Sequence, residues 1–250
     1  MQKLDINNSK GEKLAGILYK AENSNKIIIV CHGRLCTKDS HFYPELCQKL
    51  HENGFNAYRF DFSGNGQGQG QFKESTISKD IEDIKSVVDF LKEKGFEIFC
   101  LIGHSQGSVE VLLHQAKYGS AKHIIDIAGV VDQENQTIRK YTPQQIQELE
   151  SKGFFTILSD GQYFDISKEY FYDRYEYGDI RHKVMGIKVP VLVIHGTKDG
   201  DIDFVNGKMM HEAIEGSKFV PIEGAGHFFE DEGHRSQLIK NIVNWLTNNK

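Results

Sequence analysis

The sequence predicts an α/β fold, in which a mostly parallel central sheet is covered by helices on both faces. Short runs of β-branched residues, such as Ile27-Ile28-Ile29-Val30, are typical of strands buried on both faces. Stretches with apolar residues at helical spacing lie between these runs, and strands that alternate with helices indicate parallel pairing. A chain of 250 residues, 39% hydrophobic and 26% charged, suits one globular domain spanning 1–250.

The expected elements follow one another from the N-terminus in a strand–helix rhythm. Strands are expected at 13–19, 26–31, 55–60, 98–102, 122–127, 189–194 and 217–222, and helices at 42–52, from 77 to near 95, at 108–118 and at 236–247. In the second helix, apolar residues recur at steps of four and three, which places them on one face: Ile77, Ile81, Ile84, Val88 and Leu91. Gly54 and Gly95 are suited to end the helices before them.

Composition and charge exclude several functional classes. The net charge is −5, the pI is about 6.1 and the basic residues are scattered, which argues against a nucleic-acid partner. No stretch approaches the roughly 18 apolar residues of a membrane span, and the start of the chain lacks the apolar run of a signal peptide. Cys31, Cys36, Cys47 and Cys100 show no framework spacing, so we expect reduced thiols and a cytoplasmic location.

Residues 133–185 interrupt the rhythm between two expected strands. They are polar and charged, and they contain six of the ten tyrosines: Tyr141, Tyr163, Tyr170, Tyr172, Tyr175 and Tyr177. A stretch this long between strands is usually functional, so we expect a cap over the working edge of the sheet. A packing insertion with its own small aromatic core is the alternative, and the two interpretations are compatible.

The segment 61–70 is dense in glycine, a composition shared with phosphate-binding loops. Gln69 or Gln71 occupies the third glycine position of that pattern, and no Gly-Lys-Ser/Thr follows. We therefore expect a flexible loop without a nucleotide.

The pentapeptide Gly103-His104-Ser105-Gln106-Gly107 follows one expected strand and precedes a helix. This is the context of a nucleophile elbow, a sharp turn on which a serine sits at strained backbone angles. The residues two positions away on each side must lack bulk, which Gly103 and Gly107 satisfy. Ser105 is therefore the candidate nucleophile, and a simple tight turn is the alternative.

A serine hydroxyl needs a base to take its proton and a carboxylate to orient that base. Asp199 and His227 each follow an expected strand, at the edge where ligands gather in parallel sheets. Asp201 and Asp203 are rival acids, and His234 is a rival base. The spacing of the three aspartates also resembles a calcium loop, but Phe204 and Met210 stand at its glycine and glutamate positions, so no metal is expected.

The oxyanion of an acyl-transfer intermediate needs two hydrogen-bond donors. The backbone N–H of Gln106, directly after the serine, is one candidate, and the backbone N–H of Arg34 in the His32-Gly33-Arg34 turn is the other. The Arg34 side chain is expected to face either substrate or a surface ion pair. His32, His104 and His195 are expected to have structural roles.

Together these motifs resemble the α/β-hydrolase superfamily. The resemblance rests on five segments: His32-Gly33, Asp61 with the Gly64, Gly66 and Gly70 loop, the Ser105 pentapeptide, 195–199 and 224–227. Within the superfamily, the chain is most similar to cinnamoyl or feruloyl esterases and to monoacylglycerol-lipase-like or serine-aminopeptidase-like hydrolases. The resemblance implies ester cleavage through an acyl-enzyme, no cofactor, and a cap between the sixth and seventh strands.

The chain departs from the usual family pattern at three places, which leave the substrate class open. Arg34 stands where an aromatic or aliphatic residue is common, Ser108 where a glycine is frequent, and 63–68 differs from the usual glycine loop.

We therefore expect a serine hydrolase of small aromatic or medium acyl esters, with Tyr141, Tyr163 and Tyr170 lining the substrate pocket. A thioesterase or acyltransferase would use the same triad. An aminopeptidase-like enzyme would bind a free amine through acidic groups, for which Asp160, Asp165 and Glu169 are candidates. A non-catalytic binding protein is a further alternative. The expected partner is a small-molecule ester, and the sequence leaves the oligomeric state open, a homodimer included.

Overall fold

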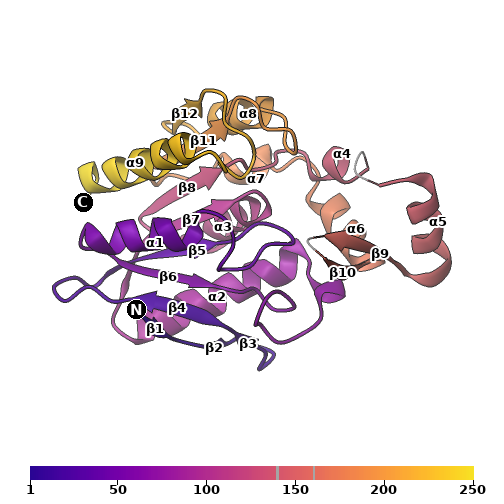
Figure 1. Cartoon of the computed structure of the whole chain (residues 1–250), viewed down its shortest axis with the longest axis horizontal. Helices are drawn as coiled ribbons and strands as arrows, with labels where there is room; N and C mark the ends of the chain where they lie inside the picture. Colours follow the sequence, from indigo (N-terminus) through magenta and orange to yellow (C-terminus); the bar gives the residue numbers. More distant parts are fainter. Residues whose placement is uncertain (139–140, 160) are drawn as a thin grey trace.

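The predicted α/β fold class is confirmed. The computed structural model describes residues 1–138, 141–159 and 161–250, and within these ranges eight strands form one sheet. In spatial order they are β1 (Gln2–Lys3), β4 (Gly16–Tyr19), β6 (Asn56–Phe60), β5 (Lys26–Cys31), β7 (Glu97–His104), β8 (His123–Ile127), β11 (Val191–Gly196) and β12 (Lys218–Ile222) (Figure 1). The six strands from β6 to β12 pair in parallel, whereas β1 and β4 are antiparallel to their neighbours.

The expected strand at 13–19 is divided into two short strands. Its first part, β3 (Lys13–Leu14), pairs with β2 (Ile6–Asn7), and its second part is β4. Ala15 lies between β3 and β4, where the chain passes from the small sheet to the large one. Its carbonyl accepts a hydrogen bond from the N–H of Asp61.

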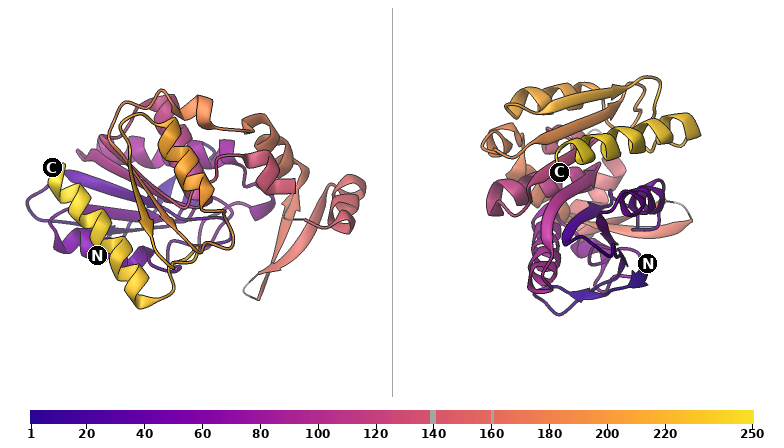
Figure 2. Two further views of the ribbon diagram at one scale, coloured as in Figure 1. Left: turned by 90° about the horizontal axis from the view of Figure 1, so that it is seen from above. Right: turned by 90° about the vertical axis from the view of Figure 1, so that its left-hand side faces the viewer.

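Helices cover both faces of the large sheet, and each face has its own apolar core. The helices α2 (Ile77–Glu93), α3 (Gln106–Tyr118), α7 (Arg181–Val184) and α8 (Val205–Ala213) contribute to one core, and α1 (Tyr43–Glu52) and α9 (Glu232–Asn248) contribute to the other. The two layers are separated by the sheet in Figure 2.

One helix was not predicted, and another begins well before its predicted start. Helix α8 was not expected, because it contains Gly207; a Cβ there would lie 2.8 Å from the Cβ of His195, so the glycine permits close packing of the helix on β11. Helix α9 begins earlier than predicted, since the side chain of Asp231 caps it by accepting a hydrogen bond from the N–H of His234.

The insertion lies beyond the end of β8 (Figure 1). It contains α4 (Gln133–Ile138), α5 (Pro143–Lys152), a hairpin of β9 (Phe154–Ser159) and β10 (Gln162–Ser167), α6 (Lys168–Tyr177) and α7. Five of its buried side chains form a separate cluster (Leu149, Phe155, Ile166, Tyr170 and Phe171), whereas Ile180 and Val184 join a core of the main sheet. Figure 2 shows the hairpin and α5 standing away from the main sheet. The hairpin was not predicted, because strands with one face toward solvent lack a continuous apolar run.

Candidate active site

Ser105 occupies a strained turn between β7 and α3. Its backbone has φ 56° and ψ −119°, a region that non-glycine residues seldom adopt. A Cβ at Gly103 would lie 2.2 Å from the carbonyl oxygen of Gly107, and a Cβ at Gly107 would lie 2.4 Å from that of His32. Both positions therefore require glycine, as the pentapeptide predicted. The turn brings Ser105 next to the His32–Arg34 segment.

Ser105, His227 and Asp199 lie in one hydrogen-bonded chain. The Nε2 atom of His227 is 3.0 Å from the Oγ atom of Ser105, and its Nδ1 atom is 2.7 Å from Oδ2 of Asp199. With an ionised carboxylate at Asp199, the proton on the ring belongs on Nδ1, and Nε2 is left to accept the serine proton. The three residues come from three different loops at the C-terminal ends of β7, β11 and β12.

The rival residues lie elsewhere. Asp201 and Asp203 are exposed, and the N–H groups of Asp201 and Ile202 donate to Oδ1 of Asp199, at 2.9 and 2.8 Å. The Nδ1 atom of His234 is 3.7 Å from Oδ1 of Asp231, at the start of α9. The structure thus places Asp199, rather than its neighbours, behind His227.

Asp199 is held in its ionised form. Burial disfavours its charge, but hydrogen bonds with His195 and His227 outweigh that effect, and its pKa lies well below the usual range. His195 Nε2 is 3.2 Å from Asp199 Oδ2. His195, which was expected to be structural, therefore also supports the carboxylate.

A second chain of hydrogen bonds joins the loops around Ser105. The N–H of Gly33 donates to the hydroxyl of Tyr43 at 3.2 Å, and this hydroxyl is 2.7 Å from Nδ1 of His104. His104 Nε2 is 3.0 Å from the carbonyl oxygen of His227. Burial and the nearby His227 hold the pKa of His104 well below its usual range, so the ring is neutral, donates from Nε2 and accepts from Tyr43. Sequence reasoning missed Tyr43, because an aromatic residue on an apolar helix face carries no polar signal.

Hydrogen bonds of the His32 ring hold the turn that carries Arg34. His32 Nδ1 is 2.8 Å from the carbonyl oxygen of Gly33, and the N–H of Phe62 donates to Nε2 at 3.2 Å. A Cβ at Gly33 would lie 3.1 Å from the Cβ of Ser105. In the described residues, no backbone carbonyl accepts a hydrogen bond from the N–H of Arg34 or Gln106.

The glycine loop differs from the flexible loop that was expected. Asp61 accepts hydrogen bonds from the N–H of Lys38 at 2.7 Å, from the Nζ of Lys38 at 2.9 Å and from the N–H of Gln67 at 2.9 Å. At Gly66, where φ is 51°, a Cβ would lie 2.6 Å from this carboxylate. The buried carboxylate therefore holds the loop, and the glycines let the backbone close around it.

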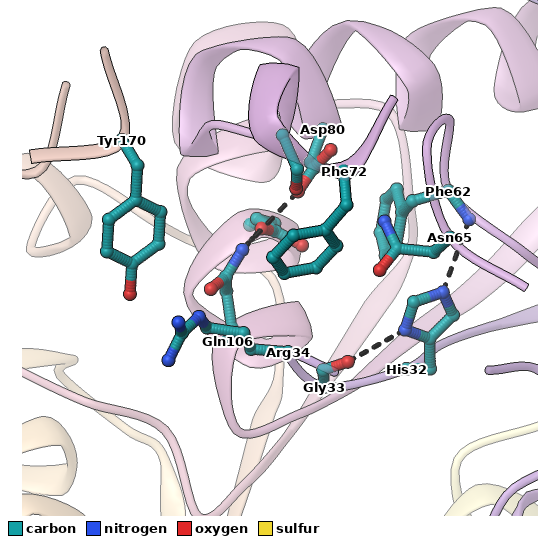
Figure 3. Close-up of a pocket in the computed structure, with 11 residues that line it drawn as sticks. His32, Gly33, Arg34, Phe62, Asn65, Phe72, Asp80, Gln106 and Tyr170 are labelled. Atoms are coloured by element: carbon teal, nitrogen blue, oxygen red, sulfur yellow. Dashed lines mark hydrogen bonds between the residues drawn. The ribbon is translucent and has the colours of Figure 1, made fainter. Parts of the chain in front are cut away.

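Two hollows adjoin Ser105. The larger has a volume of about 490 Å³, and its lining includes Leu35, His41, Asp201, Phe228 and Glu230. The smaller, of about 40 Å³, lies toward α6 and is lined in part by Arg34, Gln106, Gln133, Tyr170 and Arg174. Close by is a further small hollow, and Figure 3 shows Arg34, Gln106 and Tyr170 gathered on one side of it, with His32, Phe62 and Asn65 on the other.

The three predicted cap tyrosines have different positions. Tyr170 lines the smaller hollow, and Tyr141 packs on Phe155 and lies 5.7 Å from the guanidinium of Arg34. Tyr163 is 77% exposed on β10 and lines neither hollow. Its assignment to the pocket is therefore corrected, because Tyr163 lies at the start of β10, where the neighbouring Gln162 is exposed as well and the strand is buried only toward its other end.

Arg174 links the insertion to the elbow and was not anticipated. It lies on α6, is 5% exposed and donates hydrogen bonds to the side-chain oxygens of Gln106 and Gln133. Gln106 in turn donates to Glu110 at 2.8 Å. A charged residue in a tyrosine-rich helix gives no sequence signal of this contact.

Among the described residues, no cluster of three or more histidine, cysteine, aspartate or glutamate side chains could hold a metal ion. No helix in the same part of the chain is long and apolar enough to cross a membrane.

Comparison with known families decides the classification. Residues 22–162 match the model of a hydrolase family described as serine aminopeptidase, S33. The chain belongs to this family. It is accordingly a member of the α/β-hydrolase superfamily, as its motifs and its sheet indicated.

Several curated relatives are named as hydrolases or thioesterases. The human palmitoyl-protein thioesterase ABHD10 is 29% identical over 163 residues, which is 62% of this chain and 50% of the relative. The human serine hydrolase BPHL is 24% identical over 208 residues, covering 76% of this chain and 69% of the relative. The chain thus spans about half the length of the ABHD10 relatives that it matches.

Solved structures share the fold along nearly the whole chain. Est1E from Butyrivibrio proteoclasticus, solved with ferulic acid bound, superposes with a TM-score of 0.84 at 22% identity and 98% coverage of each chain. Mouse α/β-hydrolase domain-containing protein 10 superposes with a TM-score of 0.82 at 21% identity and full coverage of both chains.

Proposed function

We propose that this hydrolase cleaves carboxylic esters through an acyl-enzyme, with Ser105 as nucleophile, His227 as general base and acid, and Asp199 as the group that orients His227. The observation that carries the proposal is the chain of two hydrogen bonds, 3.0 Å from Ser105 to His227 and 2.7 Å from His227 to Asp199. These distances are within the reach that proton transfer from a serine requires.

In the proposed reaction, the Oγ atom of Ser105 attacks the ester carbonyl while Nε2 of His227 takes the serine proton. The N–H groups of Arg34 and Gln106 donate to the resulting oxyanion. His227 then gives the proton to the departing alkoxide, which leaves as an alcohol. A water molecule, deprotonated by His227, attacks the acyl-enzyme, and the carboxylic acid departs as the proton returns to Ser105.

The insertion at 133–185 acts in this proposal as a cap that closes one side of the pocket. Arg174 supports this role, since it joins α6 to Gln106, directly beside the nucleophile. The larger hollow, of about 490 Å³ and with Leu35, Ile202 and Phe228 in its lining, suits a small aromatic or medium acyl group.

Thioester cleavage is the second candidate, because several curated relatives are named palmitoyl-protein thioesterase. Peptidase activity has less support, although the family is named for an aminopeptidase. Asp165 accepts a hydrogen bond from Thr156 on the hairpin, Glu169 is exposed, and neither lines a hollow at Ser105. Asp160, the third amine-binding candidate, lies outside the described residues.

The test is a panel of 4-nitrophenyl esters and acyl thioesters, assayed with wild type and Ser105→Ala. We expect kcat to fall by about 10⁴-fold or more in the variant, and a fluorophosphonate probe to label wild type but not Ser105→Ala. Equal turnover by both proteins would reject the mechanism. A higher kcat/KM for an ester than for the thioester with the same acyl group would favour ester cleavage, and the reverse would favour thioester cleavage.

A further inference from the structure

The guanidinium of Arg34 has buried donors that no described residue satisfies. Its Nε and Nη2 atoms are shielded from solvent and have no hydrogen-bond partner within the described ranges. The other arginines of the described chain all donate to side-chain oxygens: Arg59 to Asp39, Arg174 to Gln106 and Gln133, Arg181 to Asp179, and Arg235 to Glu45. Burying guanidinium donors without a partner is costly, which indicates a site where a ligand supplies the acceptors.

The Arg34 side chain is held in place by aromatic rings rather than by an acid. Its guanidinium carbon lies 4.8 Å from the ring centre of Tyr170 and 5.7 Å from that of Tyr141. The guanidinium of Arg174 lies 4.4 Å from the same Tyr170 ring. Contact with a ring face orients a guanidinium and leaves the N–H groups in its plane available for an acceptor.

Arg34, Arg174 and Ser105 line the same small hollow. The acids behind it, Asp80 and Glu110, carry little charge near neutral pH. Burial and the nearby charge of Asp83 raise the pKa of Asp80 to about 8, and burial and the nearby Asp80 raise that of Glu110 well above its usual value.

Of the other acidic groups near Ser105, Asp199 is ionised but is bound by His227 and His195 and does not line this hollow. Asp201 and Glu230 are exposed and line the larger hollow instead. The hollow under α6 is therefore positively charged.

We propose that Arg34, assisted by Arg174, binds a carboxylate or similar anionic group on the substrate, and that the enzyme prefers esters in which such a group lies a few bonds from the scissile carbonyl. The proposal rests on the proposed ester hydrolysis and adds the substrate class to it. A planar carboxylate matches the fork of Arg34 in a bidentate arrangement. The volume of about 40 Å³ suits a group of this size rather than an extended chain.

The first experiment compares 4-nitrophenyl butyrate with mono(4-nitrophenyl) glutarate, which adds a terminal carboxylate. In wild type we expect kcat/KM to be higher for the glutarate ester. In Arg34→Met, the ratio of the two kcat/KM values should fall at least tenfold, whereas Arg34→Lys should retain part of the preference. Arg181→Met is the matched control, since Arg181 pairs with Asp179 on the surface, and its ratio should stay within twofold of wild type.

A ratio that Arg34→Met leaves unchanged would overturn the proposal, as would an equal loss for both esters, since Arg34 would then serve only the turn. If Arg34→Met fails to fold by circular dichroism, Arg34→Gln takes its place.

Binding of free glutarate to Ser105→Ala, measured calorimetrically, separates this proposal from the hydrolytic one. Glutarate should bind to Ser105→Ala, and its affinity should be lower at high salt. In the double variant Ser105→Ala/Arg34→Met, the affinity for glutarate should be at least tenfold lower. Absence of glutarate binding to Ser105→Ala rejects the anion site, whatever the reaction. Turnover by Ser105→Ala, by contrast, rejects only the mechanism.

Discussion

Replacing Tyr43 with phenylalanine removes one oxygen atom that joins the turn before Arg34 to the elbow histidine. The side chain is 1% exposed, and its hydroxyl accepts from the N–H of Gly33 and donates to Nδ1 of His104. The variant leaves a buried donor and a buried acceptor without a partner, each at a cost of about 1–3 kcal/mol. We therefore expect the free energy of unfolding to fall by about 2–6 kcal/mol in urea titrations. We also expect kcat to fall about tenfold, because His104 would hold the His227 carbonyl less firmly.

Tyr58→Phe is the matched control for this prediction. Tyr58 is also fully buried, but its hydroxyl makes a hydrogen bond to the carbonyl oxygen of Leu4, far from Ser105, at 2.8 Å. It should lose about 1 kcal/mol of stability and no kcat. A loss of stability in Tyr43→Phe no larger than that of Tyr58→Phe would refute the reasoning.

Two further predictions concern the packing and the charge behind Ser105. Gly107→Ala should lower the free energy of unfolding by about 1–3 kcal/mol or more and abolish most esterase activity, because its Cβ would meet the backbone of His32. Gly186→Ala has no atom within 4 Å of its Cβ and is the control; similar losses in both variants would contradict the steric argument. For Asp80→Asn, the free energy of unfolding should increase relative to that of wild type as the pH rises from about 4 to about 8. Between these values the unfolded chain ionises Asp80 while the fold keeps it protonated, so wild type loses stability with rising pH. Urea titrations at pH 5 and pH 8 measure this, and a stability difference that is constant with pH would contradict it.

Much of the fold follows from local pattern. The buried strands were predicted because continuous β-branched runs such as 27–30 are suited only to a doubly covered sheet. The elbow was predicted because a strained serine restricts its neighbours to glycine, a demand that acts over two residues. Helix α8 escaped prediction because Gly207 argues against a helix unless its partner strand is known.

The arrangement of the site depended on contacts between distant segments. The sequence singled out three neighbouring aspartates, and only the loop path after β11 places Asp199, and not Asp201 or Asp203, against His227. The hairpin that turns Tyr163 to solvent and the α6 position that brings Arg174 to Gln106 likewise have no local signal.

By itself, the sequence determined the layered sheet and the glycine-flanked elbow around Ser105, because sterics and periodicity operate within a few residues, and it supplied the candidates for the proposed acid and base. Only the tertiary structure decided which carboxylate faces His227, what supports His104 and where the charge of Arg34 points. Those outcomes depend on which side chains meet across loops separated by tens of residues, and on how burial alters the cost of leaving each polar group without a partner.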